Sequence, residues 1–139
     1  MASKDFIKVE ATIAAPVEKV WALWTGPEHI TQWNFAAPEW HAPYAENDLQ
    51  PNGRFKYTMA ARDGSMSFDF EGTYTEVEEH KLIKYTLDDG RTVELTFEAQ
   101  GGQTKVTELF EPETQNPHEM QQAGWQAILN NFKAYAEGK

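Results

Sequence analysis

The sequence predicts an α+β fold in which an antiparallel sheet packs against one long C-terminal helix. Alternating apolar and polar residues, the period of a strand with one buried face, recur along most of the chain. Two short helical segments lie between residues 17 and 33, and a broad amphipathic pattern runs from residue 116 to about residue 137. A long amphipathic helix folded against a sheet predicts a curved sheet with a cavity beneath it.

Length and composition indicate the class of protein. The 139 residues predict one domain over residues 1–139, and 40% hydrophobic residues supply enough material for a core. A formal net charge of −10 leaves no basic patch, which argues against binding to nucleic acid or to an anionic membrane. The absence of cysteine excludes disulfides, thiolate nucleophiles and cysteine-ligated zinc. Because the chain also lacks a spanning apolar run and an apolar leader, we expect a cytoplasmic protein.

The N-terminal elements follow from simple patterns. Apolar residues alternate with polar ones over Ile7–Ile13, which predicts a strand that Pro16 ends. In the next segment the apolar residues recur at helical spacing, namely Val17, Val20, Trp21 and Trp24. Gly26-Pro27 breaks this helix before a second short one. The irregular stretch that follows, residues 34–52, contains one predicted edge strand near residues 40–48.

Three predicted hairpins place the large apolar residues of the chain's middle on one face. The turns are a type I′ turn at Asp63-Gly64, a three-residue turn at residues 88–90 with Gly90 left-handed, and a two-residue turn at Gly101-Gly102. The resulting inward pairs are Met59 with Phe68, Tyr57 with Phe70, Phe55 with Gly72, Tyr85 with Val93, Ile83 with Leu95, Phe97 with Val106, and Val93 with Phe110. The hairpins therefore predict one continuous inner surface.

Glu108 departs from that apolar pattern, because the third hairpin places it on the inner face opposite Leu95. A carboxylate that faces a core is costly unless it is hydrogen-bonded, paired or wetted by a cavity. Five interpretations stay open: a ligand anchor, a proton-handling group with a raised pKa, a structural hydrogen bond to a neighbouring tyrosine or tryptophan, a β-bulge, and a register error. Arg91 reaches Glu108 only if the sheet curls strongly, and the alternative for Arg91 is a solvated rim position.

The last helix is predicted to begin at Asn116 as the N-cap, with Pro117 at the first helical position and Glu119 completing a capping box. The apolar residues of its broad face are Met120, Trp125, Ile128, Leu129, Phe132 and Tyr135. Gly124 inside this helix predicts close approach to the sheet or the cavity, since glycine costs up to about 1 kcal/mol there relative to alanine.

The order of these elements and several short stretches carry a family resemblance. The stretches are residues 15–21 with Thr25 and Trp33, then residues 48–55, 68–74 and 124–125. Over nearly the whole chain they resemble the bacterial branch of the Hsp90-ATPase-activator-homologue (AHSA1) family, within the START/Bet v 1-like (SRPBCC) superfamily. The chain departs from the family at Asn52-Gly53, where members commonly carry a double glycine. The resemblance implies the helix-grip fold, in β-α-α-β6-α order with an internal cavity.

The superfamily to which this resemblance points includes lipid and hormone carriers, polyketide cyclases and domains that stimulate the Hsp90 ATPase, so fold alone does not decide the chemistry. The first hypothesis is a binding protein for a small, mainly apolar or aromatic molecule in the cavity. Its predicted ligand-binding residues are Trp33, Trp40, Tyr57, Phe68, Phe70, Tyr85, Leu95, Glu108, Trp125 and Leu129. Any one of these side chains can instead be ordinary core packing.

Two other hypotheses stay open. One is an enzyme of cyclase or hydrolase type, with Glu108 as general acid or base and His41 nearby. The histidines show no spacing that assembles a catalytic pair, and Gln122 stands where a zinc-binding helix needs its second histidine, so we predict no catalytic set, metal site or cofactor. The other is a chaperone cofactor or similar interaction module. A homodimer through a sheet edge or the loop near Trp40 is a further possibility.

Overall fold

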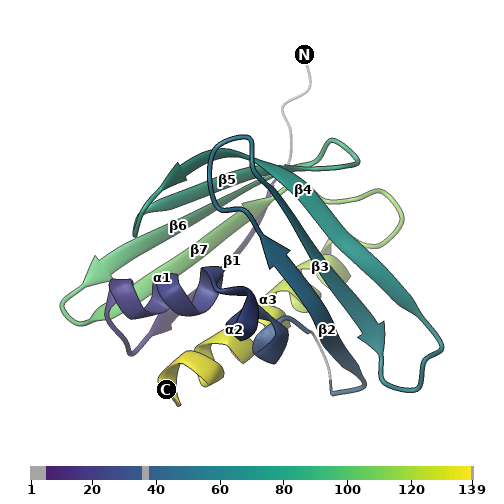
Figure 1. Ribbon diagram of the computed structural model, residues 1–139, viewed down its shortest axis with the longest axis horizontal. Helices are drawn as coiled ribbons and strands as arrows, with labels where there is room; N and C mark the ends of the chain where they lie inside the picture. Colours follow the sequence, from purple (N-terminus) through teal and green to yellow (C-terminus); the bar gives the residue numbers. More distant parts are fainter. Residues whose placement is uncertain (1–5, 36–37, 139) are drawn as a thin grey trace.

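The structure is a computed structural model that describes residues 6–35 and 38–138. Seven strands and three helices form in this part of the chain (Figure 1). The elements, in chain order, are β1 (Ile7–Ile13), α1 (Val17–Thr25), α2 (Pro27–Trp33), β2 (Trp40–Asn47), β3 (Arg54–Ala61), β4 (Ser67–Glu78), β5 (Leu82–Leu87), β6 (Thr92–Gln100), β7 (Gln103–Phe110) and α3 (His118–Glu137). The predicted α+β helix-grip fold and its element order are confirmed.

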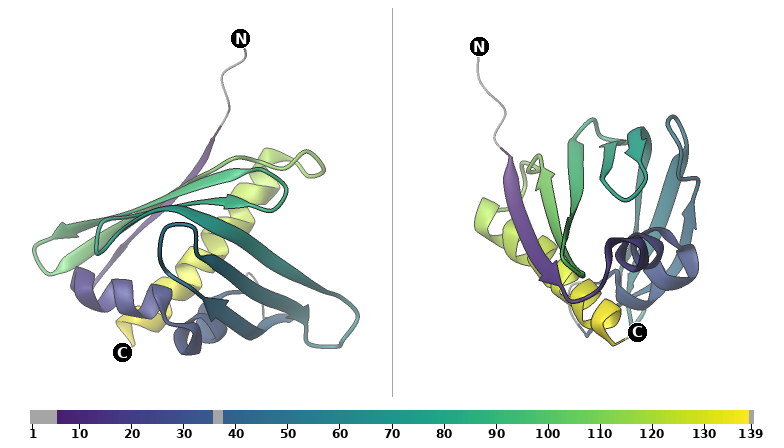
Figure 2. Two further views of the ribbon diagram at one scale, coloured as in Figure 1. Left: turned by 45° about the horizontal axis from the view of Figure 1, so that its top comes forward. Right: turned by 90° about the vertical axis from the view of Figure 1, so that its left-hand side faces the viewer.

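The strands form one antiparallel sheet in the order β1-β7-β6-β5-β4-β3-β2, so β1 and β2 are its edges. Figure 2 shows the sheet curled into a half-barrel, with α3 running along its open side and α1 and α2 beneath one end. None of the helices in the described residues combines the length and apolar character needed to cross a membrane.

Side chains of α3 bind the helix to the edge strand β1. The amides of Gln122 and Gln126 donate to the carbonyl oxygens of Lys8 and Glu10, at 3.1 and 3.2 Å. About two turns further on, Lys133 donates to a third carbonyl of the same strand, that of Thr12. Because an edge strand has unpaired backbone groups, these bonds satisfy that edge and fix how α3 is rotated above the sheet.

The predicted hairpin registers are confirmed, including Tyr57 with Phe70 and Leu95 with Glu108. The positive φ values of Gly90, Gly101 and Gly102 match the predicted second and third turns. The first turn differs from the prediction, because a type I′ turn needs positive φ at both central residues and only Gly64 has it. The ladder instead closes at the bond from the Ala61 N–H to the Met66 carbonyl, which leaves a four-residue loop.

The start of α3 also differs from the prediction. Pro117 is the N-cap, and no side chain caps the helix, so the predicted Asn116 cap and the capping box with Glu119 do not form. The segment before the helix is held by Gln121, whose amide donates to the backbone carbonyls of Glu113 and Asn116. Its amide oxygen accepts from the Glu113 N–H at 2.8 Å. A buried glutamine within the helix, and not an N-cap side chain, therefore fixes the segment that leads into α3.

The well-packed core lies at one end of the half-barrel, where α1 and the second half of α3 meet the strands. Trp24, Trp33 and Phe132 form a cluster there, with ring centroids 4.7 to 4.9 Å apart. Leu129 and Phe132 have no exposed surface. This end of the molecule is tightly packed, and the space that remains between sheet and helix begins at Trp24 and Trp33 and lies towards the first half of α3.

The glycines of β4 and α3 predict opposite responses to alanine. A Cβ on Gly72 would lie 2.6 Å from the Thr86 carbonyl oxygen and 3.0 Å from the Phe55 ring, so Gly72→Ala should lower the free energy of unfolding by about 1–3 kcal/mol. A Cβ on Gly124 would meet nothing within 4 Å, so the expected close approach is wrong. Gly124→Ala should therefore stabilise the protein by up to about 1 kcal/mol. Urea denaturation of both variants measures the two changes in the free energy of unfolding, and equal changes would contradict the prediction.

Candidate functional site

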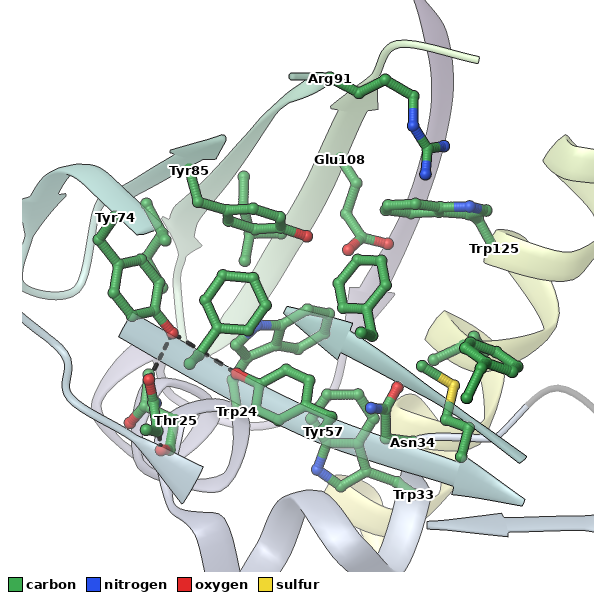
Figure 3. Close-up of a pocket in the computed structure, with 18 of the residues that line it drawn as sticks. Trp24, Thr25, Trp33, Asn34, Tyr57, Tyr74, Tyr85, Arg91, Glu108 and Trp125 are labelled. Carbon is green, nitrogen blue, oxygen red and sulfur yellow. Dashed lines mark hydrogen bonds between the residues drawn. The ribbon is translucent and has the colours of Figure 1, made fainter. Parts of the chain in front are cut away.

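A pocket of about 380 Å³ lies between the inner face of the sheet and the first half of α3 (Figure 3). Its size falls within the range of about 300–1,000 Å³ that is usual for small-molecule sites. The residues that line it are Trp24, Thr25, Trp33, Asn34, Asn47, Phe55, Tyr57, Met59, Phe68, Phe70, Tyr74, Ile83, Tyr85, Arg91, Leu95, Glu108, Glu113, Asn116, Gln121, Trp125 and Ile128. Aromatic side chains from the sheet, α1, α2 and α3 dominate this lining.

The aromatic wall results from the alternation of β3, β4 and β5, which turns every second side chain inward. Phe55 lies at its centre, with the rings of Tyr57, Tyr74 and Tyr85 at centroid distances of 4.8 to 5.2 Å. On the opposite side of the pocket, Trp125 of α3 stacks on Phe110 at 3.9 Å with an interplanar angle of 9°. The wall is therefore built from side chains that packing already holds in place.

A short chain of hydrogen bonds closes one end of the pocket. The hydroxyls of Tyr57 and Tyr74 lie 3.5 Å apart, the Tyr74 hydroxyl donates to the Asn47 side-chain oxygen, and the Asn47 amide donates to the Thr25 carbonyl at 2.8 Å (Figure 3). Burial raises the pKa of Tyr57 to about 12 and moves the pKa of Tyr74 upward too. These hydroxyls therefore stay protonated at neutral pH and act as fixed polar groups.

Glu108 is the buried carboxyl group of the pocket. The residue is 6% exposed, and burial raises the pKa of its side chain to about 8. Its carboxyl group makes no hydrogen bond or ion pair with any residue in the described part of the chain, and Figure 3 shows it directed into the pocket beside the Tyr85 hydroxyl and the Trp125 ring. The inward position predicted from the Gly101-Gly102 hairpin is thus confirmed, and a structural hydrogen bond does not explain it.

Arg91 occupies the rim position that was the alternative to pairing with Glu108. It lies just after the β5–β6 turn, where its Nε donates to Asp89 at 2.8 Å. Its side chain is 26% exposed while also bordering the pocket. No ion pair joins Arg91 to Glu108, and the guanidinium stays at the mouth of the pocket, paired with Asp89.

Eight of the ten residues predicted to bind a ligand border the pocket: Trp33, Tyr57, Phe68, Phe70, Tyr85, Leu95, Glu108 and Trp125. Whether they contact a ligand stays a prediction. Leu129 lies instead in the hydrophobic core with no exposed surface, and Trp40 packs edge-on against Phe68 at 5.8 Å outside the lining. Neither side chain borders the pocket.

The structure adds polar lining residues that sequence reasoning missed. Asn34 follows α2 and is 6% exposed, and Asn47 ends β2. Both come from the irregular stretch between residues 34 and 52, where no periodicity indicates which side chains face inward. Phe55 and Ile83 were already on the predicted inner face by register, so the hairpin pairing was a signal that could have placed them in the pocket.

The arrangement lacks the partner that the enzyme hypothesis needs. His41 lies on β2 and is not among the pocket-lining residues. In the described residues, no group of three histidine or carboxylate side chains is close enough together to hold a metal ion. What the site presents is a set of aromatic rings and one buried carboxyl group.

Comparisons with known proteins agree with this architecture. Residues 14–137 match the family described as Activator of Hsp90 ATPase homolog 1-like protein. The solution structure of an AHSA1-like protein from Aeromonas hydrophila is 45% identical, with a TM-score of 0.91 over 96% of this chain and 93% of that chain. Chr148 from Cytophaga hutchinsonii is 54% identical, with a TM-score of 0.83 over 96% and 92%. A Chromobacterium violaceum protein, CV1439, shares the fold at 22% identity, with a TM-score of 0.85 over 96% and 98%. No curated protein matches the sequence.

Proposed function

The chain belongs to the Activator of Hsp90 ATPase homolog 1-like family, and from this premise we propose that it binds a small, mainly apolar or aromatic molecule in the pocket between sheet and α3. The observation that carries the proposal is the 380 Å³ pocket itself, walled by aromatic rings in a molecule whose other end is tightly packed. A void of this size forfeits dispersion contacts along its whole lining. A ligand of matching shape restores them.

The distribution of polar groups also supports a ligand site over an imperfect core. Buried polar atoms in a core are normally hydrogen-bonded to protein. Here the carboxyl group of Glu108 faces the pocket with no hydrogen-bond partner among the described residues, while the chain of hydrogen bonds from Tyr57 to Thr25 satisfies the polar groups at one end. Apolar walls with few polar groups are the usual lining of a small-molecule site.

A pocket-filling substitution tests this proposal. Ile128 lines the pocket from α3 and is half-buried, so Ile128→Trp should place an indole in the ligand's space. Met120 lies on the same helix, is 62% exposed and is not part of the lining, so Met120→Trp makes an equally large change outside the pocket. In a thermal-shift screen of lipids and aromatic metabolites, a pocket ligand should raise the Tm of the wild type and of Met120→Trp, but not that of Ile128→Trp.

The comparison of the three proteins decides the outcome. Compounds that raise the Tm of all three equally bind elsewhere and contradict the proposal. A screen in which no compound raises the Tm of the wild type more than that of Ile128→Trp also contradicts the proposal, and would favour the interaction-module hypothesis. Both variants must first show the wild-type far-ultraviolet circular dichroism and one cooperative unfolding transition, so that a lost Tm shift is not a lost fold.

A further inference from the structure

Glu108 has a position that an uncharged ligand does not explain. It lies in the middle of β7, between Val106 and Phe110 on the inner face, and pairs across the strands with Leu95 and Val9. All four neighbours are buried apolar residues. If the ligand needed only a neutral hydrogen-bonding group here, a glutamine would supply one without the cost of a titrating acid. What a glutamate adds is the capacity to become an anion when a cation arrives.

Aromatic rings surround the space in front of this carboxyl group. Phe70 lies edge-on to Trp125 at 6.0 Å and edge-on to Tyr85 at 6.3 Å, and all three rings line the same pocket. In Figure 3 the Tyr85 ring and the Trp125 ring lie on either side of the Glu108 carboxyl group. Ring faces attract cations through their quadrupoles, most strongly where water is excluded. Rings and carboxyl group together make the surroundings that a buried ammonium group requires.

The other ionisable groups of the lining leave this role to Glu108. Tyr57, Tyr74 and Tyr85 come from β3, β4 and β5, and burial raises the pKa of each. Arg91 at the rim is paired with Asp89. Glu113, before α3, also borders the pocket, but its carboxylate already accepts from the Asn116 N–H at 2.8 Å. The described lining residues of α1, α2 and α3 are not ionisable.

We infer that the ligand carries a positively charged amine on an aromatic or apolar scaffold, and that Glu108 binds this amine within the cage formed by Phe70, Tyr85 and Trp125. The inference rests on the proposed function and specifies the chemical class of its ligand. With a pKa of about 8, the empty pocket holds Glu108 mostly protonated at pH 7. The arriving ammonium group favours the carboxylate, so binding releases the Glu108 proton to the solvent.

Three probes of nearly equal shape test the inference: 2-naphthylmethylamine, 2-naphthylmethanol and 2-naphthoic acid, which are cationic, neutral and anionic at pH 8. Calorimetric titration of the wild type should give at least about tenfold tighter binding of the amine than of the alcohol, and the weakest binding for the acid. Because ionised Glu108 is the binding form, affinity for the amine should rise about 50-fold between pH 6 and pH 8. Titration in buffers of different ionisation enthalpy should show release of nearly one proton at pH 7.

Glu108→Gln should abolish the preference for the amine, its pH dependence and its proton release, while the alcohol still binds. If the wild type binds alcohol and amine equally, or if affinity for the amine falls as the pH rises, the inference is wrong. Binding of the alcohol that Ile128→Trp blocks would then leave the proposed function intact. If Ile128→Trp blocks none of the three probes, the proposed function fails together with the inference.

Discussion

Replacing Glu108 by glutamine is expected to raise the free energy of unfolding at pH 9 by up to about 5 kcal/mol, and to leave it nearly unchanged at pH 4. The cause is a folded-state pKa of about 8 against an ordinary value of 4.5, at about 1.4 kcal/mol for each pH unit. The amide keeps the size and polarity of the side chain but cannot ionise. Urea denaturation of both proteins from pH 4 to pH 9 measures the difference.

The direction of this effect follows from where the proton is bound. Below pH 4.5 Glu108 is protonated in both the folded and the unfolded wild type, so its contribution to stability is fully present. As the pH rises, the unfolded chain loses the proton first, and stability falls until the folded protein has lost it too, near pH 8. The advantage of Glu108→Gln should therefore grow between these values and then level off.

The matched control is Glu98→Gln on the exposed end of β6, which makes the same chemical change without burial. Its effect measures what the loss of an exposed carboxylate does, so subtracting it isolates the contribution of burial at Glu108. A pH-independent difference between wild type and Glu108→Gln would mean that water or a protein group stabilises the buried anion. The pocket would then not hold a neutral carboxyl group in its empty state.

Much of the sheet could be predicted because the positions of the turns and the alternation of apolar and polar residues along the strands constrain each other. At the third hairpin, only the register that begins at Gly101-Gly102 places Val93, Phe97, Val106 and Phe110 on one face, and the same register places Glu108 there. A slip of one residue would have exposed the apolar residues. The inward position of the Glu108 carboxylate could therefore be predicted, because the apolar residues near it in sequence determine the register.

In α3 and in the irregular stretch of residues 34–52, sequence periodicity does not determine which side chains reach the pocket. Trp125 and Leu129 are one turn apart, and periodicity places both on the buried face of α3. Only the rotation of the helix decides which one reaches the pocket, and bonds such as that from Gln122 to β1 set this rotation. Asn34 lies in a stretch without periodicity, so nothing in the sequence indicates that it faces inward.

Trp125→Ala is expected to weaken binding of a pocket ligand by about 10- to 100-fold, while costing about 1–3 kcal/mol in stability. The indole ring of Trp125 stacks on the Phe110 ring at a centroid distance of 3.9 Å, and it forms a T-shaped pair with the Phe70 ring at a centroid distance of 6.0 Å. Part of its contacts therefore stabilise the fold. The side chain is only half-buried and borders the pocket. Its removal therefore takes away a wall of the ligand's site as well as packing.

Trp21→Ala is the matched control, because it removes the same side chain from α1 at a position that is 7% exposed and not part of the pocket lining. Trp21 packs against Phe97 at 5.1 Å, and its loss should cost about 3–5 kcal/mol of stability. Ligand affinity should survive in the molecules that stay folded. Equilibrium denaturation beside calorimetric titration of the compound with the largest thermal shift separates the two quantities. A Trp125→Ala protein that loses stability yet binds that compound as the wild type does would assign Trp125 to the core.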